Sequence, residues 1–152
     1  MKRRAVLSAA AASAAALALP SWSQGPLPAV EVYKSPTCGC CGDWVDHLKA
    51  AGFAVKVIEV DDTSAARKRL RMPADFGSCH TGLVGGYVVE GHVPAKDIKK
   101  LLNTRPSAIG LAVPGMPVGS PGMEVGSQQD AYDVLLIDKQ GRKSVFAHYP
   151  QV

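Results

Sequence analysis

The chain has 152 residues, which is enough for one domain with a modest hydrophobic core. Apolar residues make up 47% of it, a share typical of folded proteins, so the composition argues against a disordered chain. The formal net charge of +4 comes from 17 basic and 13 acidic side chains, and three of the basic ones lie within the first four residues. The rest of the chain is nearly neutral, so its charge gives no indication of a nucleic-acid partner.

The N-terminal residues have the pattern of an export signal. Residues 2–4 are basic, residues 5–19 form an alanine-rich apolar run, and residues 21–23 offer a cleavage site between small side chains. The run is too short and too rich in alanine for a membrane span. We therefore expect a signal peptide over residues 1–23, suited to the Sec or the twin-arginine (Tat) route, and a mature periplasmic domain over residues 24–152 without membrane contact. An uncleaved anchor helix is the alternative.

The first part of the mature chain alternates between strand and helix patterns. Apolar residues at every second position predict strands, and apolar residues three or four apart predict helices. From these patterns we expect strands over 30–33 and 53–60, helices over 41–51 and 61–71, a hairpin of strands 81–84 and 87–90, and a helix from Pro94. The resulting order, β-α-β-α-β-β-α, is that of a thioredoxin-like α/β fold.

The last third of the chain has a different character. Residues 108–124 are rich in glycine and contain three prolines, which predicts a loop without any helix or strand. Residues 133–138 and 144–148 then predict a C-terminal β-hairpin that turns around Gly141.

The stretch SPTCGCCGDW places Cys38, Cys40 and Cys41 just before the first expected helix. Cys38 and Cys41 have the C-x-x-C spacing at which a helix N-terminus can hold two sulfurs close enough to form a redox disulfide. Cys40 complicates this interpretation, because a third thiol can attack any disulfide formed beside it. Soft sulfur donors can instead converge on one Cu(I) ion. From this motif alone a redox pair, a structural disulfide and a metal site stay equally open.

Cys79 and His80 precede the third expected strand. In a thioredoxin-like fold this position faces the start of the first helix, and redox members normally carry a cis-proline there. A thiol and an imidazole add metal ligands instead, which favours the metal hypothesis. The alternative is a structural disulfide between Cys79 and Cys40, with His80 as a capping residue.

Two methionines, Met116 and Met123, lie in the proline- and glycine-rich loop. Thioether sulfur favours Cu(I) over zinc, so both side chains are candidate ligands of the same site. The alternative is that they fill gaps beneath a long covering loop.

The other polar features are expected to lie outside the site. His47 is interpreted as an exposed residue of the first helix and His92 as a capping residue, while His148 has no assigned place. The basic residues between Arg67 and Arg71 are interpreted as a solvated helix face.

Three stretches, YKSPTCGCCGDW, SCHTGLVGGYVVEGHVP and GLAVPGMPVGSPGME, together resemble a bacterial domain-of-unknown-function family, number four hundred and eleven. The resemblance covers the chain from Val30 to Glu124. It implies a thioredoxin-like periplasmic domain that stores, chaperones or detoxifies copper. By position it implicates Cys38, Cys40, Cys41, Cys79 and His80 as metal ligands, with Met116 and Met123 as further candidates.

We therefore expect a periplasmic protein that binds Cu(I) through cysteine thiolates and exchanges it with other copper-handling proteins. A Cys₃His zinc site is chemically sound but leaves the methionines without a role. The rival interpretation is a thiol–disulfide oxidoreductase in which Cys38 is the nucleophile and Cys41 resolves the mixed disulfide. A third interpretation is a small domain held together by disulfides, without a metal.

Overall fold

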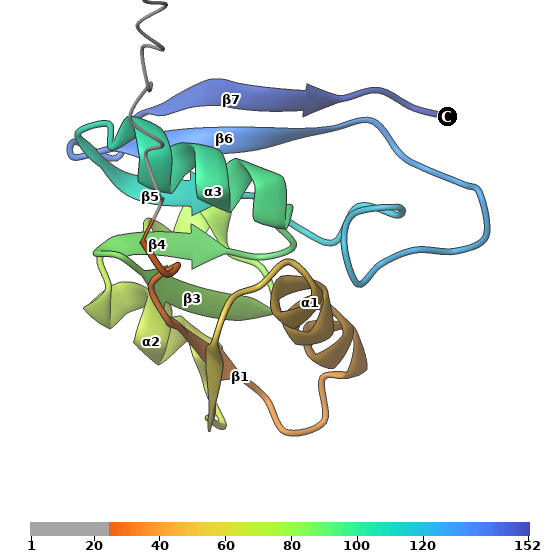
Figure 1. Ribbon diagram of the computed structural model, residues 1–152, viewed down its shortest axis with the longest axis horizontal. Coiled ribbons are helices and arrows are strands. Elements are labelled where there is room, and N and C mark those ends of the chain that lie inside the picture. Colours follow the sequence, from red (N-terminus) through yellow and green to blue (C-terminus); the bar gives the residue numbers. More distant parts are fainter. Residues whose placement is uncertain (1–24) are drawn as a thin grey trace, which may run out of the picture.

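The structure, a computed structural model, describes residues 25–152 (Figure 1). The signal peptide expected over residues 1–23 therefore lies outside the described residues. Between residues 25 and 152, no helix is both long and apolar enough to span a bilayer.

The described chain folds into one seven-stranded sheet with three α-helices. In chain order the elements are β1 (Val30–Lys34), α1 (Gly39–Ala50), β2 (Val55–Glu59), α2 (Thr63–Arg69), the 3-10 helix η1 (Ala74–Phe76), β3 (His80–Val84), β4 (Tyr87–Glu90), α3 (Ala95–Thr104), β5 (Ala108–Ala112), β6 (Tyr132–Asp138) and β7 (Lys143–Tyr149). The strand order across the sheet is β2-β1-β3-β4-β5-β6-β7. Figure 1 shows α1 and α3 in front of this sheet, and the long β5–β6 loop beside α1.

The pairing of the strands confirms the thioredoxin-like class. β1 runs parallel to β2 and antiparallel to β3, and β3 and β4 form a hairpin across the Gly85-Gly86 turn. β6 and β7 form the expected C-terminal hairpin, which extends the sheet beyond the thioredoxin-like part. The predicted elements up to the end of α3 are all present, with ends that differ by a few residues.

The loop predicted over residues 108–124 is wrong in its first five residues. Ala108–Ala112 form β5, which pairs in parallel with β4 and joins it to β6. The first of the three prolines is Pro114, so the strand ends before any of them. Gly110 lies against Val88 so closely that an added Cβ would be 1.7 Å from the Val88 carbonyl oxygen. The glycine that suggested a loop is therefore what lets these two strands approach.

The main core lies between the sheet and the two helices α1 and α3. Its largest fully buried side chains include Trp44, Leu48, Ile98 and Leu101. The indole nitrogen of Trp44 donates a hydrogen bond to the Val93 carbonyl at 2.9 Å. This bond ties α1 to the segment between β4 and α3, because a buried indole N–H needs an acceptor.

Helices α1 and α2 begin in different ways. Asp62 caps α2, since its carboxylate accepts a hydrogen bond from the Ser64 amide at 2.8 Å. Helix α1, in contrast, begins at Gly39 with Cys38 at the N-cap and has no side-chain cap. Cys38, the first cysteine of the motif, therefore lies at the N-terminus of α1.

Two histidines do not have the roles that the sequence suggested. His47 is half-buried rather than exposed, and its Nε2 atom accepts a hydrogen bond from the Ala95 amide, the first residue of α3, at 3.0 Å. His92 is fully buried and makes no capping bond to that helix, whose N-cap is Pro94. Burial lowers the pKa of His47, so the neutral ring that can accept this bond is favoured.

Candidate metal centre

The cysteine motif lies at the end of β1 and the first turn of α1. Cys38 and Cys41 are joined by a disulfide, as their C-x-x-C spacing allows. Cys40 is not bridged, and its sulfur lies 3.6 Å from that of Cys38. All three sulfurs therefore lie on the same side of the helix start.

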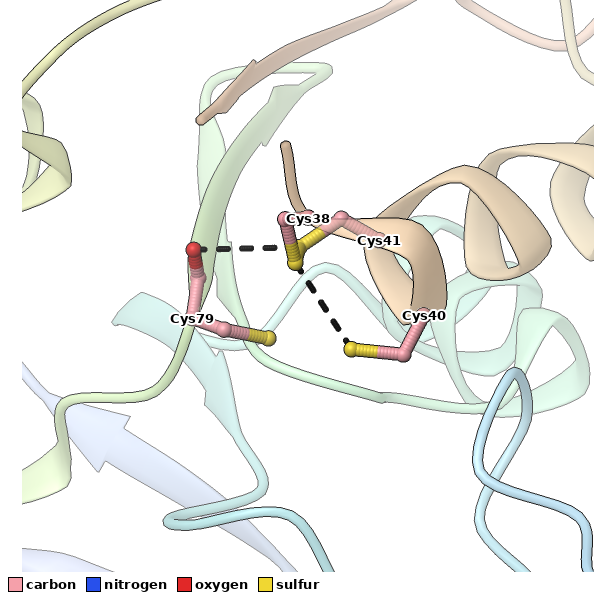
Figure 2. A group of neighbouring side chains, drawn as sticks. All are labelled: Cys38, Cys40, Cys41 and Cys79. Carbon is pink, nitrogen blue, oxygen red and sulfur yellow. Dashed lines mark hydrogen bonds between the residues drawn. A yellow bond between two sulfur atoms is a disulfide. The ribbon is translucent and has the colours of Figure 1, made fainter. Parts of the chain in front are cut away.

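Cys79 faces this turn from the segment that enters β3. Its carbonyl oxygen lies 3.9 Å from the Cys41 sulfur, and its own sulfur is one of four that lie within 4.8 Å of one another. Figure 2 shows Cys40 and Cys79 approaching the disulfide from two different elements. The alternative of a structural disulfide between Cys40 and Cys79 is wrong, because both are free cysteines.

Two imidazoles complete the surroundings of Cys79. The Cys79 sulfur lies 3.3 Å from Nδ1 of His80 and 3.2 Å from Nε2 of His92. Both rings are fully buried, and they meet edge to face with centroids 4.9 Å apart. His80 also packs on the Trp44 indole, with ring centroids 4.3 Å apart. Cys79 thus belongs both to the group of four sulfurs and to a second group, Cys79, His80 and His92.

The hydrogen bonds assign the protons of these rings. Nδ1 of His92 lies 2.8 Å from the Pro121 carbonyl oxygen, which can only accept, so Nδ1 carries the proton of the neutral ring. The lone pair on Nε2 of His92 then points to the Cys79 sulfur, and the single thiol proton is donated to it. His80 consequently donates to that sulfur through Nδ1, which leaves its own Nε2 without a proton. That Nε2 is buried and has no hydrogen-bond partner.

Burial determines which protonation states Cys79, His80 and His92 adopt. It lowers the pKa of His80 to about 3, helped by the neighbouring His92, and it also lowers the pKa of His92. Burial and the nearby Cys40 raise the pKa of Cys79 to about 11. At neutral pH the two rings are therefore uncharged, with lone pairs available for a metal, while the Cys79 thiol must lose a proton to become a ligand.

The loop between β5 and β6 closes over the site at Pro121 and Gly122. Pro121 supplies the carbonyl that orients His92, and Gly122 lies against the first turn of α1. Met123 follows directly and is partly buried, whereas Met116 is 52% exposed. The alternative in which both methionines fill gaps beneath the loop is therefore wrong for Met116.

Sequence reasoning brought Cys38, Cys40, Cys41, Cys79 and His80 together correctly but missed His92. The signal for His92 was present in the predicted hairpin. β3 and β4 pair antiparallel with Thr81 opposite Glu90, and continuing that register by two residues places His92 beside Cys79. The hairpin register, rather than the spacing of residues in a motif, identifies this side chain.

The basic run was also interpreted incorrectly for one of its members. Arg67 exposes only 11% of its side chain, and its guanidinium forms an ion pair with the fully buried Glu90 at 2.8 Å. Arg69 stacks over the Tyr33 ring, 4.8 Å from its centroid. The solvated face expected for residues 67–71 therefore does not describe Arg67, whereas Arg69 is exposed as expected.

The fold and the cysteine motif define a thioredoxin-like protein, and the comparisons agree. Residues 30–75 match the glutaredoxin family, and residues 76–123 match a family described as a protein of unknown function, DUF411. Two solved structures, forms 1 and 2 of the copper resistance protein CopG, are each 52% identical to this chain. The matches cover 82% of this chain and 98% and 99% of the CopG chains, with TM-scores of 0.77 and 0.78.

The chain therefore belongs to the DUF411 family, as the resemblance seen in its sequence implied, and it is similar to CopG over most of its length. No curated protein sequence matches it.

Proposed function

We propose that this protein binds Cu(I) through the thiolates of Cys38, Cys40, Cys41 and Cys79 and serves in copper tolerance or trafficking. The observation that carries the proposal is the convergence of these four sulfurs within 4.8 Å, with two buried imidazoles beside Cys79. Thiolate sulfur selects for soft ions such as Cu(I), and neutral imidazole also suits copper. The names of the similar CopG structures, copper resistance proteins, support copper over zinc.

His80, His92, Met116 and Met123 are further candidate ligands within this proposal. His80 and His92 each direct a ring nitrogen to the Cys79 sulfur, so a metal held by that sulfur has an imidazole close by. Met116 is exposed enough to meet an incoming ion, and Met123 follows the residue that touches α1.

Binding through all four thiolates requires the Cys38–Cys41 disulfide to be reduced. Reduction by a dithiol adds two electrons and two protons and gives two thiols, while the dithiol becomes a disulfide. The thiols then release their protons as the metal binds. In the oxidised form Cys40, Cys79 and the two histidines keep their donor atoms, because the disulfide uses only Cys38 and Cys41.

A second candidate is a thiol–disulfide oxidoreductase, which is favoured by the Cys38–Cys41 disulfide and by the glutaredoxin match over residues 30–75. In that function Cys38 attacks a substrate disulfide, and Cys41 resolves the mixed disulfide. It assigns no role to Cys40 or to the buried histidines. Turnover of a small disulfide substrate by a Cys40→Ser variant, at the native rate, would favour this candidate.

The copper proposal is tested by anaerobic titration of the fully reduced protein with Cu(I) in competition with a chromophoric chelator. Native protein is expected to withdraw copper from the chelator, and a variant with Cys38, Cys40 and Cys41 all changed to serine is expected to withdraw much less. Equal competition by the two proteins would refute the proposal.

We further propose that residues 1–23 are a signal peptide and that residues 24–152 act in the periplasm, where other copper-handling proteins supply or accept the ion. The motivation is the basic, apolar and small-residue pattern of the N-terminus. The intact mass of protein recovered from a periplasmic extract measures the cleavage. A mass that retains residues 1–23 would contradict it.

A further inference from the structure

Glu90 is a charged residue with no exposed surface, at the end of β4. Its Oε1 atom accepts hydrogen bonds from Nε of Arg67 at 2.9 Å and from the Ser78 amide at 2.7 Å. Its Oε2 atom accepts one from the Thr81 hydroxyl at 2.7 Å. Burying a carboxylate without partners costs free energy, and the hydrogen bonds from Arg67, Ser78 and Thr81 offset that cost.

Arg67 and Glu90 bind both backbone polar groups of one residue, Ser78, whose hydroxyl donates to the Gly115 carbonyl instead. The Ser78 amide donates to Glu90, and the Ser78 carbonyl accepts from Nη2 of Arg67 at 2.7 Å. The planar guanidinium can reach the carboxylate and the carbonyl together because its donors are arranged in a rigid fork. Ser78 directly precedes Cys79, so the pair fixes the chain on the N-terminal side of that cysteine.

The same carboxylate also fixes the chain beyond Cys79, through Thr81. Glu90 therefore binds Ser78 and Thr81, which lie on the two sides of Cys79. In the chain it lies two residues before His92, which is just beyond the end of β4. It joins the backbone that carries the Cys79 sulfur to the backbone that carries the His92 ring, whose Nε2 lies 3.2 Å from that sulfur. None of the described peptide bonds is cis. The Arg67–Glu90 ion pair fixes the backbone around Cys79, at the position where redox members of the thioredoxin-like fold carry a cis-proline.

We propose that Glu90 and Arg67 are positioning residues that hold Cys79 as a metal ligand. The inference rests on the proposed function, in which Cys79 binds copper. Neither residue touches the metal; both act through Ser78 and Thr81. Residues that orient ligands in this way commonly contribute about ten- to a hundredfold to metal affinity.

Arg67→Lys is the main test. A lysine keeps the positive charge beside Glu90, but a single ammonium cannot reach the carboxylate and the Ser78 carbonyl in the same fork. In the chelator competition, Cu(I) affinity is expected to fall about tenfold or more. In a Cys79→Ser background the same change is expected to have no further effect, because the residue it positions is already gone. Copper X-ray absorption should show fewer sulfur neighbours for Arg67→Lys than for native protein.

A measurement without metal makes the test independent of copper binding. Mass spectrometry measures the rate at which each cysteine of the reduced metal-free protein is alkylated. Arg67→Lys is expected to speed the alkylation of Cys79 and to leave that of Cys40 unchanged. The matched control is Asp97→Asn, since Asp97 is also a buried carboxylate but bonds the Tyr149 hydroxyl on the C-terminal hairpin at 2.5 Å. This control is expected to alter neither affinity nor alkylation.

The outcomes separate the two proposals. Native protein that competes no better than the triple-serine variant would refute copper binding, whereas unchanged Cys79 alkylation in Arg67→Lys would refute positioning. Positioning is also refuted if Arg67→Lys affects affinity no more than Asp97→Asn does, or if it adds to the effect of Cys79→Ser. Should Arg67→Lys not fold, Glu90→Gln replaces it, because glutamine keeps the size but loses the charge and one acceptor, and the same outcomes decide.

Discussion

Nε2 of His92 lies 3.2 Å from the sulfur of Cys79, although the two residues are thirteen positions apart in the chain. The β3–β4 hairpin brings the two together, and the Pro121 carbonyl turns the ring so that its lone pair meets the sulfur. A cysteine, a histidine and a carbonyl from three segments thus form one connected unit. The β5–β6 loop therefore contributes to the site through the Pro121 backbone carbonyl, independently of its two methionine side chains.

His92→Phe should weaken Cu(I) binding. Phenylalanine keeps a buried ring but removes the nitrogen beside Cys79, and about a tenfold loss of affinity in the chelator competition is expected for a ligand or an orienting residue. The Pro121 carbonyl also loses its donor, which costs about 1–3 kcal/mol of unfolding free energy. His148→Phe is the control, because His148 is exposed and pairs only with Asp133 on the outer hairpin. Native affinity in His92→Phe would exclude His92 from the site.

Cu(I) affinity should fall as the pH falls, and Cys79 should account for part of the slope. Its raised pKa, about 11, means that the thiol is protonated throughout the range from pH 5 to pH 8 and must release its proton on binding. One released proton corresponds to about a tenfold change in affinity per pH unit. Chelator competition at several pH values measures this slope, and Cys79→Ser should make it shallower by about one proton. An identical slope in the two proteins would contradict the assignment.

The fold could be predicted from the sequence wherever a local pattern determines an element. The β-branched valines of β1 and the spacing of Ile98, Leu101 and Leu102 in α3 predicted the right elements, since β1 is buried along most of its length and α3 buries one regular face. β5 was missed because its five residues gain their structure from parallel pairing with β4, a contact that no local pattern records.

The same distinction applies to the site. Cys38, Cys40 and Cys41 are neighbours in the chain, and the fold class places Cys79 and His80 opposite them. His92 and Arg67 contribute through hairpin register and through a helix that packs beside Glu90. Both are contacts between separate elements, so composition and spacing suggested a capping residue and a solvated face instead.

His80 should make the protein less stable in acid. Its folded-state pKa of about 3 lies below the ordinary value of 6.5, so the unfolded chain binds the proton more readily. The stability that the neutral ring contributes is present above pH 6.5 and is lost as the pH falls from there toward 3. Each pH unit in this window lowers the free energy of unfolding by about 1.4 kcal/mol through this group.

Urea denaturation of native protein and His80→Phe at pH 7 and at pH 4.5 measures this contribution. Phenylalanine can still pack on Trp44 but does not titrate, so the stability of the variant should fall less between the two pH values. His47 and His92, whose pKa values are also lowered, and Glu90, whose pKa is raised, are present in both proteins and cancel in the comparison. Parallel losses in the two proteins would show that His80 is protonated in the folded state.

Gly122→Ala should lift the β5–β6 loop from α1. Gly122 has a φ of +86°, and an added Cβ would lie 2.7 Å from the Cys40 carbonyl oxygen and 2.8 Å from the Trp44 amide nitrogen. These are backbone atoms of a helix, which cannot move aside, so the loop must move instead. The movement would carry the Pro121 carbonyl away from His92, and we expect both lower stability and weaker Cu(I) binding.

Gly126→Ala is the control that separates two effects of Gly122→Ala: the contact of the added Cβ with α1, and the cost of placing alanine in a left-handed backbone conformation. Gly126 also has a positive φ, +57°, but nothing lies within 4 Å of an added Cβ. Alanine in this left-handed conformation costs about 1–2 kcal/mol at either position. The overpacking at Gly122 adds about 1–3 kcal/mol more. Urea denaturation and chelator competition should therefore show an additional loss only for Gly122→Ala. Equal effects of the two substitutions would mean that the loop does not bear on the start of α1, and that the ring of His92 is oriented by its burial alone.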